Sequence, residues 1–205
     1  MRGGDRWLVW LGFWLILAAW AGNVALAQEP ILIGAVGPLS QPGAVQAGLD
    51  MRWAVETAVA DVNAAGGVLG RPLQIIFYDT QNQPNVAASV AERLVSEDRV
   101  VAVVGEYHSG AALAQIPVYT RAGIPAVFSE VWSDAITGGD PNDPNLPPNP
   151  PTIFRIAPTS SYAGAFLSDW LLNGLKVQKV IQIYEATDFG LSQASALRSQ
   201  LEPAG

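Results

Sequence analysis

The first candidate for chemistry is a histidine beside a serine, because such a pair could act as base and nucleophile. His108 is the only histidine of the 205-residue chain, and Ser109 follows it directly. A base must lie within hydrogen-bond reach of its nucleophile, whereas neighbouring side chains in an extended loop point apart. Tyr107 stands two residues before the serine, where a nucleophile elbow requires glycine. A catalytic serine is therefore not expected.

Other catalytic and cofactor sites are not indicated either. One histidine and no cysteine exclude the common zinc sites. There is no Walker phosphate-binding loop, and the glycine-rich residues 66–70 stand between an expected helix and an expected strand, the wrong position for binding a dinucleotide. The residues therefore predict a protein that is not an enzyme and that holds no metal or cofactor.

Ser109 has a second possible role, as a contact for an anionic ligand. Residues 100–104 are apolar without alternation, which predicts a strand buried on both faces of a parallel sheet. Residues 106–110 then lie between the carboxyl end of that strand and the amino end of the next helix, where ligands usually bind in open α/β sheets. Free backbone N–H groups there favour an anion. The alternative is that Ser109 is the helix N-cap, and the two roles are compatible. The candidate contacts in this loop are Tyr107, His108, Ser109 and Gly110.

The elements around this loop alternate between strand and helix. The apolar runs predict strands at 31–36, 73–78, 100–104 and 124–128. Apolar residues at three- and four-residue steps predict helices at 44–65, 84–96 and 111–121. Pro117 should bend or split the last of these helices. The alternation predicts right-handed β-α-β units and one parallel, Rossmann-like sheet.

A proline-rich segment, residues 138–151, interrupts the pattern and can be neither helix nor central strand. The oxygens of residues 140, 142, 143 and 145 leave a calcium loop open as an alternative, which the prolines and the missing glutamate disfavour. Beyond it the sequence predicts a strand at 152–156, a helix at 162–172 capped by residues 159–161, a strand at 177–184 and a helix at 191–201. This second set has too few strands to close a core of its own.

The first residues predict an export signal. Arg2 and Arg6 precede an apolar run, and residues 25–27 (Ala-Leu-Ala) form a signal-peptidase site, so cleavage is expected before Gln28. A retained membrane anchor is the alternative, which the glycines and Asn23 in the run disfavour. The formal net charge of −7 argues against nucleic-acid binding. The expected product is periplasmic, with no stable membrane insertion after cleavage.

The export signal and four later stretches together resemble a known family. The stretches are IGAVGPLSQPG, DVNAAGGVLGRPLQIIFYD, VVGEYHSGAALAQIPVYTRAGIPAVFS and IFRIAPTSSYAG. They are similar to type I periplasmic solute-binding proteins, in particular the group that delivers branched-chain amino acids and amides to ABC importers. The resemblance implies two Rossmann-like lobes, joined by three crossovers, that close over a small solute like a Venus flytrap. It also implies a chain nearly twice as long, so we expect an N-terminal fragment whose second lobe is incomplete.

The resemblance further implies which residues contact the solute. Ser109 matches the serine that holds the ligand carboxylate, Tyr107 falls on a wall position, and Phe189 matches an aromatic residue of the second lobe. A loop on which relatives usually have small residues and a threonine carries Glu130, Val131 and Trp132. Glu130 would favour a cation or an amide donor and Trp132 takes up volume, which argues against a branched-chain amino acid. The alternative is that Trp132 packs under the loop and Glu130 faces water.

The expected organisation is a signal peptide at 1–27, a first lobe at 28–151, a hinge crossover at 152–159 and the start of a second lobe at 160–205. The expected function is the binding of an amino acid, an amide or a similar small polar solute for an ABC importer, whose membrane permease is the partner. The alternative is the ligand-sensing domain of a receptor or an amide-responsive regulator. A downstream membrane span followed by a kinase or cyclase domain would favour that alternative.

Overall fold

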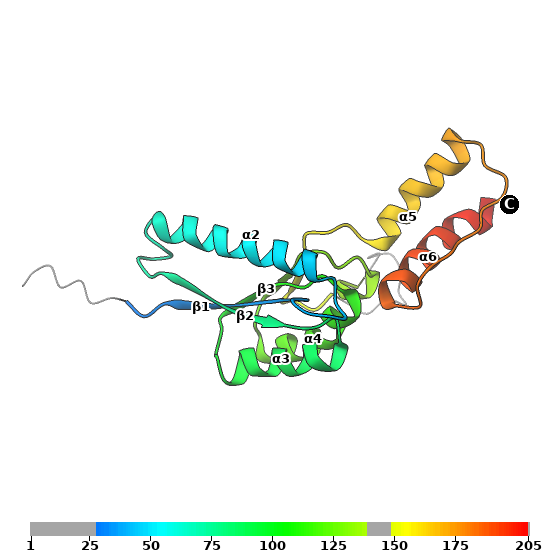
Figure 1. Cartoon of the computed structure of the whole chain (residues 1–205). Helices are drawn as coiled ribbons and strands as arrows, with labels where there is room; N and C mark the ends of the chain where they lie inside the picture. The colour runs from blue at the N-terminus through cyan, green and yellow to red at the C-terminus, as the bar shows by residue number, and fades with distance from the viewer. Residues whose placement is uncertain (1–27, 139–148, 205) are drawn as a thin grey trace, which may run out of the picture.

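The computed structural model describes residues 28–138 and 149–204, which form an α/β fold around one sheet (Figure 1). All strands are parallel, in the order β2-β1-β3-β4-β5. The strands are β1 (Ile31–Gly37), β2 (Leu73–Asp79), β3 (Ala102–Gly105), β4 (Ala126–Phe128) and β5 (Ile153–Arg155). The predicted Rossmann-like sheet is therefore confirmed. The export signal and the possible calcium ligands at 140–145 lie outside the described residues.

Three helices connect the first four strands and cover the sheet from both sides. On one face lies α2 (Val45–Ala64), and on the other lie α3 (Pro84–Ser96) and α4 (Ser109–Ala122) (Figure 1). Pro84 stands in the first turn of α3, where its missing N–H costs nothing. Gly123 ends α4 with a φ of 69°, a left-handed conformation that suits glycine. None of the described helices has the length and apolar character that crossing a membrane requires.

The hydrophobic core lies mainly on the face of the sheet that α3 and α4 cover. Val103 is fully buried on this face. The prediction that residues 100–104 are buried on both faces is wrong, because β3 begins only at Ala102 and Val101 is 55% exposed. On the opposite face α2 packs on β1 and β2, which leaves Val127 and Phe154 partly exposed. The sheet is therefore covered on the face of α3 and α4 and only partly covered on the face of α2, whereas the prediction assumed burial on both faces.

Pro117 does not split α4, which runs unbroken from Ser109 to Ala122. The proline lies on the exposed side of the helix. Gln115 and Tyr119, on either side of it in sequence, are fully buried. The continuous buried face offsets the lost hydrogen bond, a cost of about 3 kcal/mol.

Two further helices, α5 (Ser160–Asp169) and α6 (Asp188–Leu201), pack against each other beyond the edge of the sheet (Figure 1). Thr159 caps α5 as predicted, since its hydroxyl oxygen accepts a hydrogen bond from the N–H of Tyr162 at 2.9 Å. A Cβ atom on Gly164 would lie 2.8 Å from the carbonyl carbon of Ala196, so glycine is needed where the two helices meet. After residue 169 the chain makes one π-helical turn, Trp170–Gly174.

The prediction of a strand at 177–184 is wrong for the described part of the chain, in which this segment is extended but pairs with no strand. Ile181 and Ile183 are 89% and 97% exposed. A strand forms only where a neighbouring strand satisfies its backbone groups, and the described sheet ends at β5 instead. The sequence pattern indicates that the segment favours an extended backbone, but it does not show whether a neighbouring strand is present.

Candidate ligand-binding site

A cleft lies at the point of the sheet where the strand order reverses, between β1 and β3. The chain leaves both strands at the same edge of the sheet, which is where open α/β sheets bind ligands. Two adjoining cavities of about 330 and 200 Å³ lie there. We refer to them together as the cleft. The larger is lined by Ala44, Tyr107, His108, Ser109, Glu130, Trp132, Glu185 and Phe189. The smaller is lined by Asn82, Pro84, His108, Ser109, Gly110, Ala111, Glu185, Thr187 and Asp188.

Most of the predicted site residues line this cleft, although they come from three separate parts of the chain. The residues brought together are Tyr107, His108, Ser109, Gly110, Glu130, Trp132 and Phe189. Val131 is the exception, since its side chain is fully buried in the hydrophobic core. Along the loop after β4, Val131 therefore points inward while its two neighbours line the cleft.

The hydroxyl oxygen of Ser109 accepts two hydrogen bonds, and its proton has no acceptor among the residues that the structure describes. The residue is 3% exposed and is the first residue of α4, whose N-cap is His108, so the N-cap alternative for Ser109 is wrong. Its Oγ accepts hydrogen bonds from the backbone N–H groups of Trp132 and Ser133 at 3.3 and 3.2 Å. A hydroxyl has two lone pairs and one proton. With both lone pairs used, Ser109 can contribute only its proton to a further partner, which must be an acceptor.

The loop that supplies these N–H groups is fixed from its other side. Arg155 of β5 donates from Nη1 to the carbonyl oxygens of Trp132 and Ser133 at 3.3 and 2.8 Å. Ser160, at the start of α5, donates to the carbonyl oxygen of Trp132 from its backbone N–H and from its hydroxyl, at 2.8 and 3.0 Å. Burial lowers the pKa of Arg155, and the nearby carboxylate of Asp134 opposes that change. Trp132 and Ser133 are therefore held by hydrogen bonds both through their N–H groups and through their carbonyl groups.

Behind the cleft, Glu106 forms the centre of a buried hydrogen-bond network. Its carboxylate accepts from the backbone N–H of Tyr107 at 2.9 Å and from the Nε2 of Gln115 at 2.8 Å. Longer bonds come from the N–H of His108 and from the hydroxyl of Thr80, at 3.4 and 3.3 Å. Burial raises the pKa of Glu106, and these four hydrogen bonds oppose part of the rise. The carboxylate thus holds the backbone that leads into Ser109.

The turn of Glu106 is set by its glycine neighbour and by an unusual backbone conformation. Glu106 has a φ of 64°, which non-glycine residues seldom adopt. At Gly105 the φ is 113°, and a Cβ atom there would lie 2.2 Å from the carbonyl oxygen of Val36 on β1. These two residues turn the chain sharply out of β3. The hydrogen bonds to the Glu106 carboxylate support the strained turn.

Two carboxylates join α5 and α6 to the sheet and its loops, and one of them, Asp188, lines the cleft. Asp134 accepts from the N–H and the hydroxyl of Ser161 at 3.2 and 2.8 Å and from the hydroxyl of Ser192 at 3.4 Å, so it joins the loop after β4 to α5 and α6. Asp188 lies beside the amino end of α4, where a Cβ atom on Gly110 would be 2.7 Å from its Oδ2. A side chain at position 110 would therefore displace the carboxylate of Asp188.

Sequence reasoning missed four acidic or amide residues in or behind the cleft. Asn82, Glu185 and Asp188 line the cavities, and Glu106 supports them from behind. The signal available for all four was position, because each follows directly on a strand or an extended segment of the alternating pattern. No cluster of three or more potential metal ligands occurs in the part of the chain that the structure describes.

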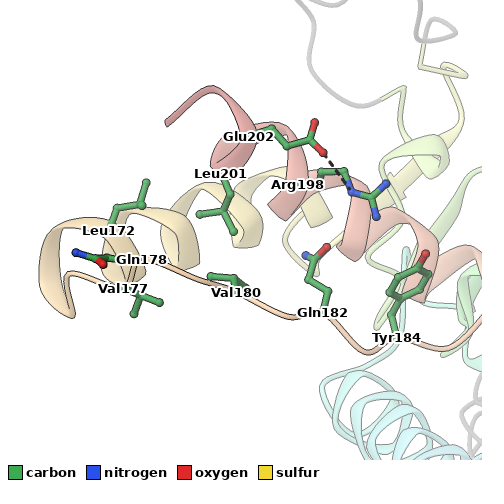
Figure 2. A pocket seen from close by; sticks show the side chains of 9 residues that line it. All are labelled: Leu172, Val177, Gln178, Val180, Gln182, Tyr184, Arg198, Leu201 and Glu202. Atoms are coloured by element: carbon green, nitrogen blue, oxygen red, sulfur yellow. Dashed lines mark ion pairs between the residues drawn. The ribbon is translucent and has the colours of Figure 1, made fainter. Parts of the chain in front are cut away.

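A larger cavity lies elsewhere, between the extended segment 177–184 and α6 (Figure 2). It measures about 710 Å³, and its lining combines four aliphatic side chains, among them Leu172 and Leu201, with polar ones that include the ion pair of Arg198 and Glu202. It lies away from the carboxyl edge of the sheet, where open α/β sheets bind ligands. We therefore assign ligand binding to the cleft beside Ser109.

A parallel sheet with a polar cleft at its switch point is the arrangement in which open α/β proteins bind their ligands. Residues 30–205 match the family model of the periplasmic binding proteins, and the chain belongs to this family. It is a family of binding proteins that act outside the cytoplasm and are not enzymes.

Similar proteins and structures support this assignment. The chain is 32% identical over 180 residues to an amino acid binding protein of Pseudomonas aeruginosa and 28% identical to the Leu/Ile/Val-binding protein of Escherichia coli. These matches cover 87% and 88% of the chain. A crystal structure of the substrate-binding protein LivJ of Streptococcus pneumoniae in complex with isoleucine superimposes with a TM-score of 0.73 at 27% identity. That match covers 83% of this chain and 46% of LivJ. The chain spans 45% and 46% of the two curated relatives.

Proposed function

We propose that the full-length protein is the solute-binding component of an ABC importer and that it binds an amino acid, an amide or a similar small polar solute. The main support is the hydroxyl proton of Ser109, which can bond only to an acceptor and lies at the amino end of α4. A carboxylate or carbonyl oxygen is the acceptor that suits this position. The names of the relatives, which include an amino acid binding protein, agree with this class of solute.

The proposed mechanism is closure of two lobes over the solute. Residues 28–151 form the first lobe, 152–159 the hinge crossover and 160–205 the start of the second lobe. Arg155 and Ser160 lie in or next to the crossover and bind the carbonyl groups of the loop after β4. A rotation about the crossover would therefore act directly on the loop whose N–H groups bind Ser109. The signal peptide would deliver the protein to the periplasm, where a membrane permease is its partner.

The experiment is a titration of the full-length protein with amino acids, their amides, aromatic acids and, as an unrelated class, neutral sugars. Trp132 lies in the cleft, so its fluorescence should report binding. Saturable binding of an amino acid or amide supports the proposal. Binding of sugars alone, or of none of these compounds, contradicts it. A receptor would bind solute in the same cleft, and a membrane span followed by a signalling domain in the complete gene would identify it as one.

A further inference from the structure

We propose that the cleft is specific for a solute with a second positive group, a basic amino acid, rather than for a neutral one. This inference rests on the proposed function and concerns the chemistry of the same site. It is carried by three independent observations on the lining of the cleft: its charged groups, its aromatic side chains and an unpartnered histidine nitrogen.

Among the residues that the structure describes, the charged groups that line the cleft are all acidic. Glu130 and Glu185 line the larger cavity, and Glu185 and Asp188 line the smaller one. Neither lining includes a lysine or an arginine. Arg155 lies under the loop after β4 and is bonded to its carbonyl groups. A neutral amino acid brings one positive and one negative group, so it would leave the excess carboxylates unbalanced when closure removes water. A second positive group on the solute would offset part of this excess.

The aromatic lining suits an organic cation. Tyr107, Trp132 and Phe189 line the same cavity as the two glutamates. The faces of aromatic rings attract ammonium and guanidinium groups, and most strongly where water is excluded. Aromatic side chains alone would equally suit an apolar solute. Their combination with Glu130 and Glu185 favours a side chain that has an aliphatic stem and a positive end.

His108 adds an unpartnered polar atom to this lining. Its Nε2 is buried and has no hydrogen-bond partner among the described residues. Burial lowers the pKa of His108, against the opposing influence of Glu185, so the imidazole is neutral at pH 7 and does not repel a cation. A neutral imidazole has one nitrogen that donates a hydrogen bond and one that accepts it. A polar group of the solute would provide the missing partner, and a hydrocarbon side chain would not.

The test uses two pairs of solutes that match in size and differ in charge. L-arginine is compared with L-citrulline, and L-lysine with L-norleucine, by calorimetric titration of the full-length protein. We expect each cationic solute to bind at least about tenfold more tightly than its neutral partner, which corresponds to about 1.4 kcal/mol. Added salt should weaken the binding of arginine more than that of citrulline.

Two isosteric variants locate the effect in the cleft. Glu130→Gln and Glu185→Gln should each weaken the binding of arginine and lysine by roughly tenfold and change the binding of citrulline and norleucine by less than about threefold. Glu97→Gln is the matched control, because Glu97 follows the end of α3 at the opposite edge of the sheet. This control should leave all four affinities unchanged. Melting temperatures of the variants would verify that they fold.

The outcomes separate this inference from the proposed function. If citrulline or norleucine binds as tightly as its cationic partner, or if the variants weaken both members of a pair equally, the inference is wrong. Binding of neutral amino acids that depends on Ser109 would leave the proposed function standing. If no amino acid or amide binds at all, both the inference and the proposed function are wrong.

Discussion

The replacement Glu106→Gln tests how the buried network supports the cleft. A glutamine side chain has one oxygen, and its amide nitrogen would face the Nε2 of Gln115, which now donates to the carboxylate at 2.8 Å. Two donors cannot bond, so the amide of Gln115 must turn over. Its Nε2 then no longer reaches the carbonyl oxygen of Ala111, a bond of 3.2 Å, and the hydroxyl of Tyr119 must accept instead of donate.

The expected loss of stability follows from this rearrangement. Below the raised pKa of Glu106 the carboxyl group is protonated and its hydrogen bonds are neutral, so the loss of one buried hydrogen bond should make the variant about 1 kcal/mol less stable at acidic pH. Urea unfolding of the full-length protein, followed by circular dichroism, measures this difference. The folding of the remaining core should be unaffected, because the variant changes no apolar contact.

The pH dependence provides the sharper test. Burial raises the pKa of Glu106 in the folded state, so between the ordinary carboxylate pKa and the raised value the folded protein holds a proton that the unfolded chain has lost. In that window the free energy of unfolding of the wild type falls by about 1.4 kcal/mol per pH unit through this group. Glutamine does not titrate, so the advantage of the wild type over the variant should shrink as the pH rises. A difference that stays constant or grows with pH would refute the argument.

Three further predictions concern other parts of the chain. Residues 28–205 expressed alone should associate as their concentration rises, because side chains such as Phe166 (73% exposed) leave apolar surface on α5; a monomer at all concentrations in sedimentation would contradict this. Gly164→Val should destabilise the contact of α5 with α6, where a Cβ atom would meet Ala196 at 2.8 Å, and hydrogen exchange should speed up in these helices but not in β3. The exported protein should begin at Gln28, and an intact mass that includes the first 27 residues would show that the signal is retained.

Much of the fold could be predicted from the sequence because its signals are local. Pro84 marks the start of α3, Thr159 caps α5, and the apolar runs identify β1 and β2 to within one residue. Prediction was wrong where the outcome depends on distant partners. Residues 177–184 have the composition of a strand but no neighbouring strand in the described sheet, and Pro117 is accommodated because the buried face of α4 continues past it.

The candidate site was also predicted where the signal is local and missed where it depends on distant contacts. The loop after β3 was identified from its position in the alternating pattern, and the resemblance added the loop after β4 and Phe189. The inward direction of Val131 could not be read from the sequence, because it depends on how one short loop packs on the core. The burial of Glu106 could not be predicted from the sequence either, since a glutamate beside a glycine usually faces water. Its burial depends on Thr80 and Gln115, which lie 26 and 9 residues away in the chain.

The most direct measurement of the central claim compares the solute affinity of Ser109→Ala with that of Ser160→Ala in the full-length protein. Both variants lose hydrogen bonds to the loop after β4, but only Ser109 lines the cleft. Ser109→Ala should weaken binding by roughly 1.5 to 3 kcal/mol, about ten- to hundredfold, and should also lower stability, because two N–H groups lose their acceptor. Ser160→Ala should lower stability by about 1 kcal/mol and leave the affinity within a factor of about three. Equal affinities for the two variants and the wild type would contradict a role of Ser109 in binding.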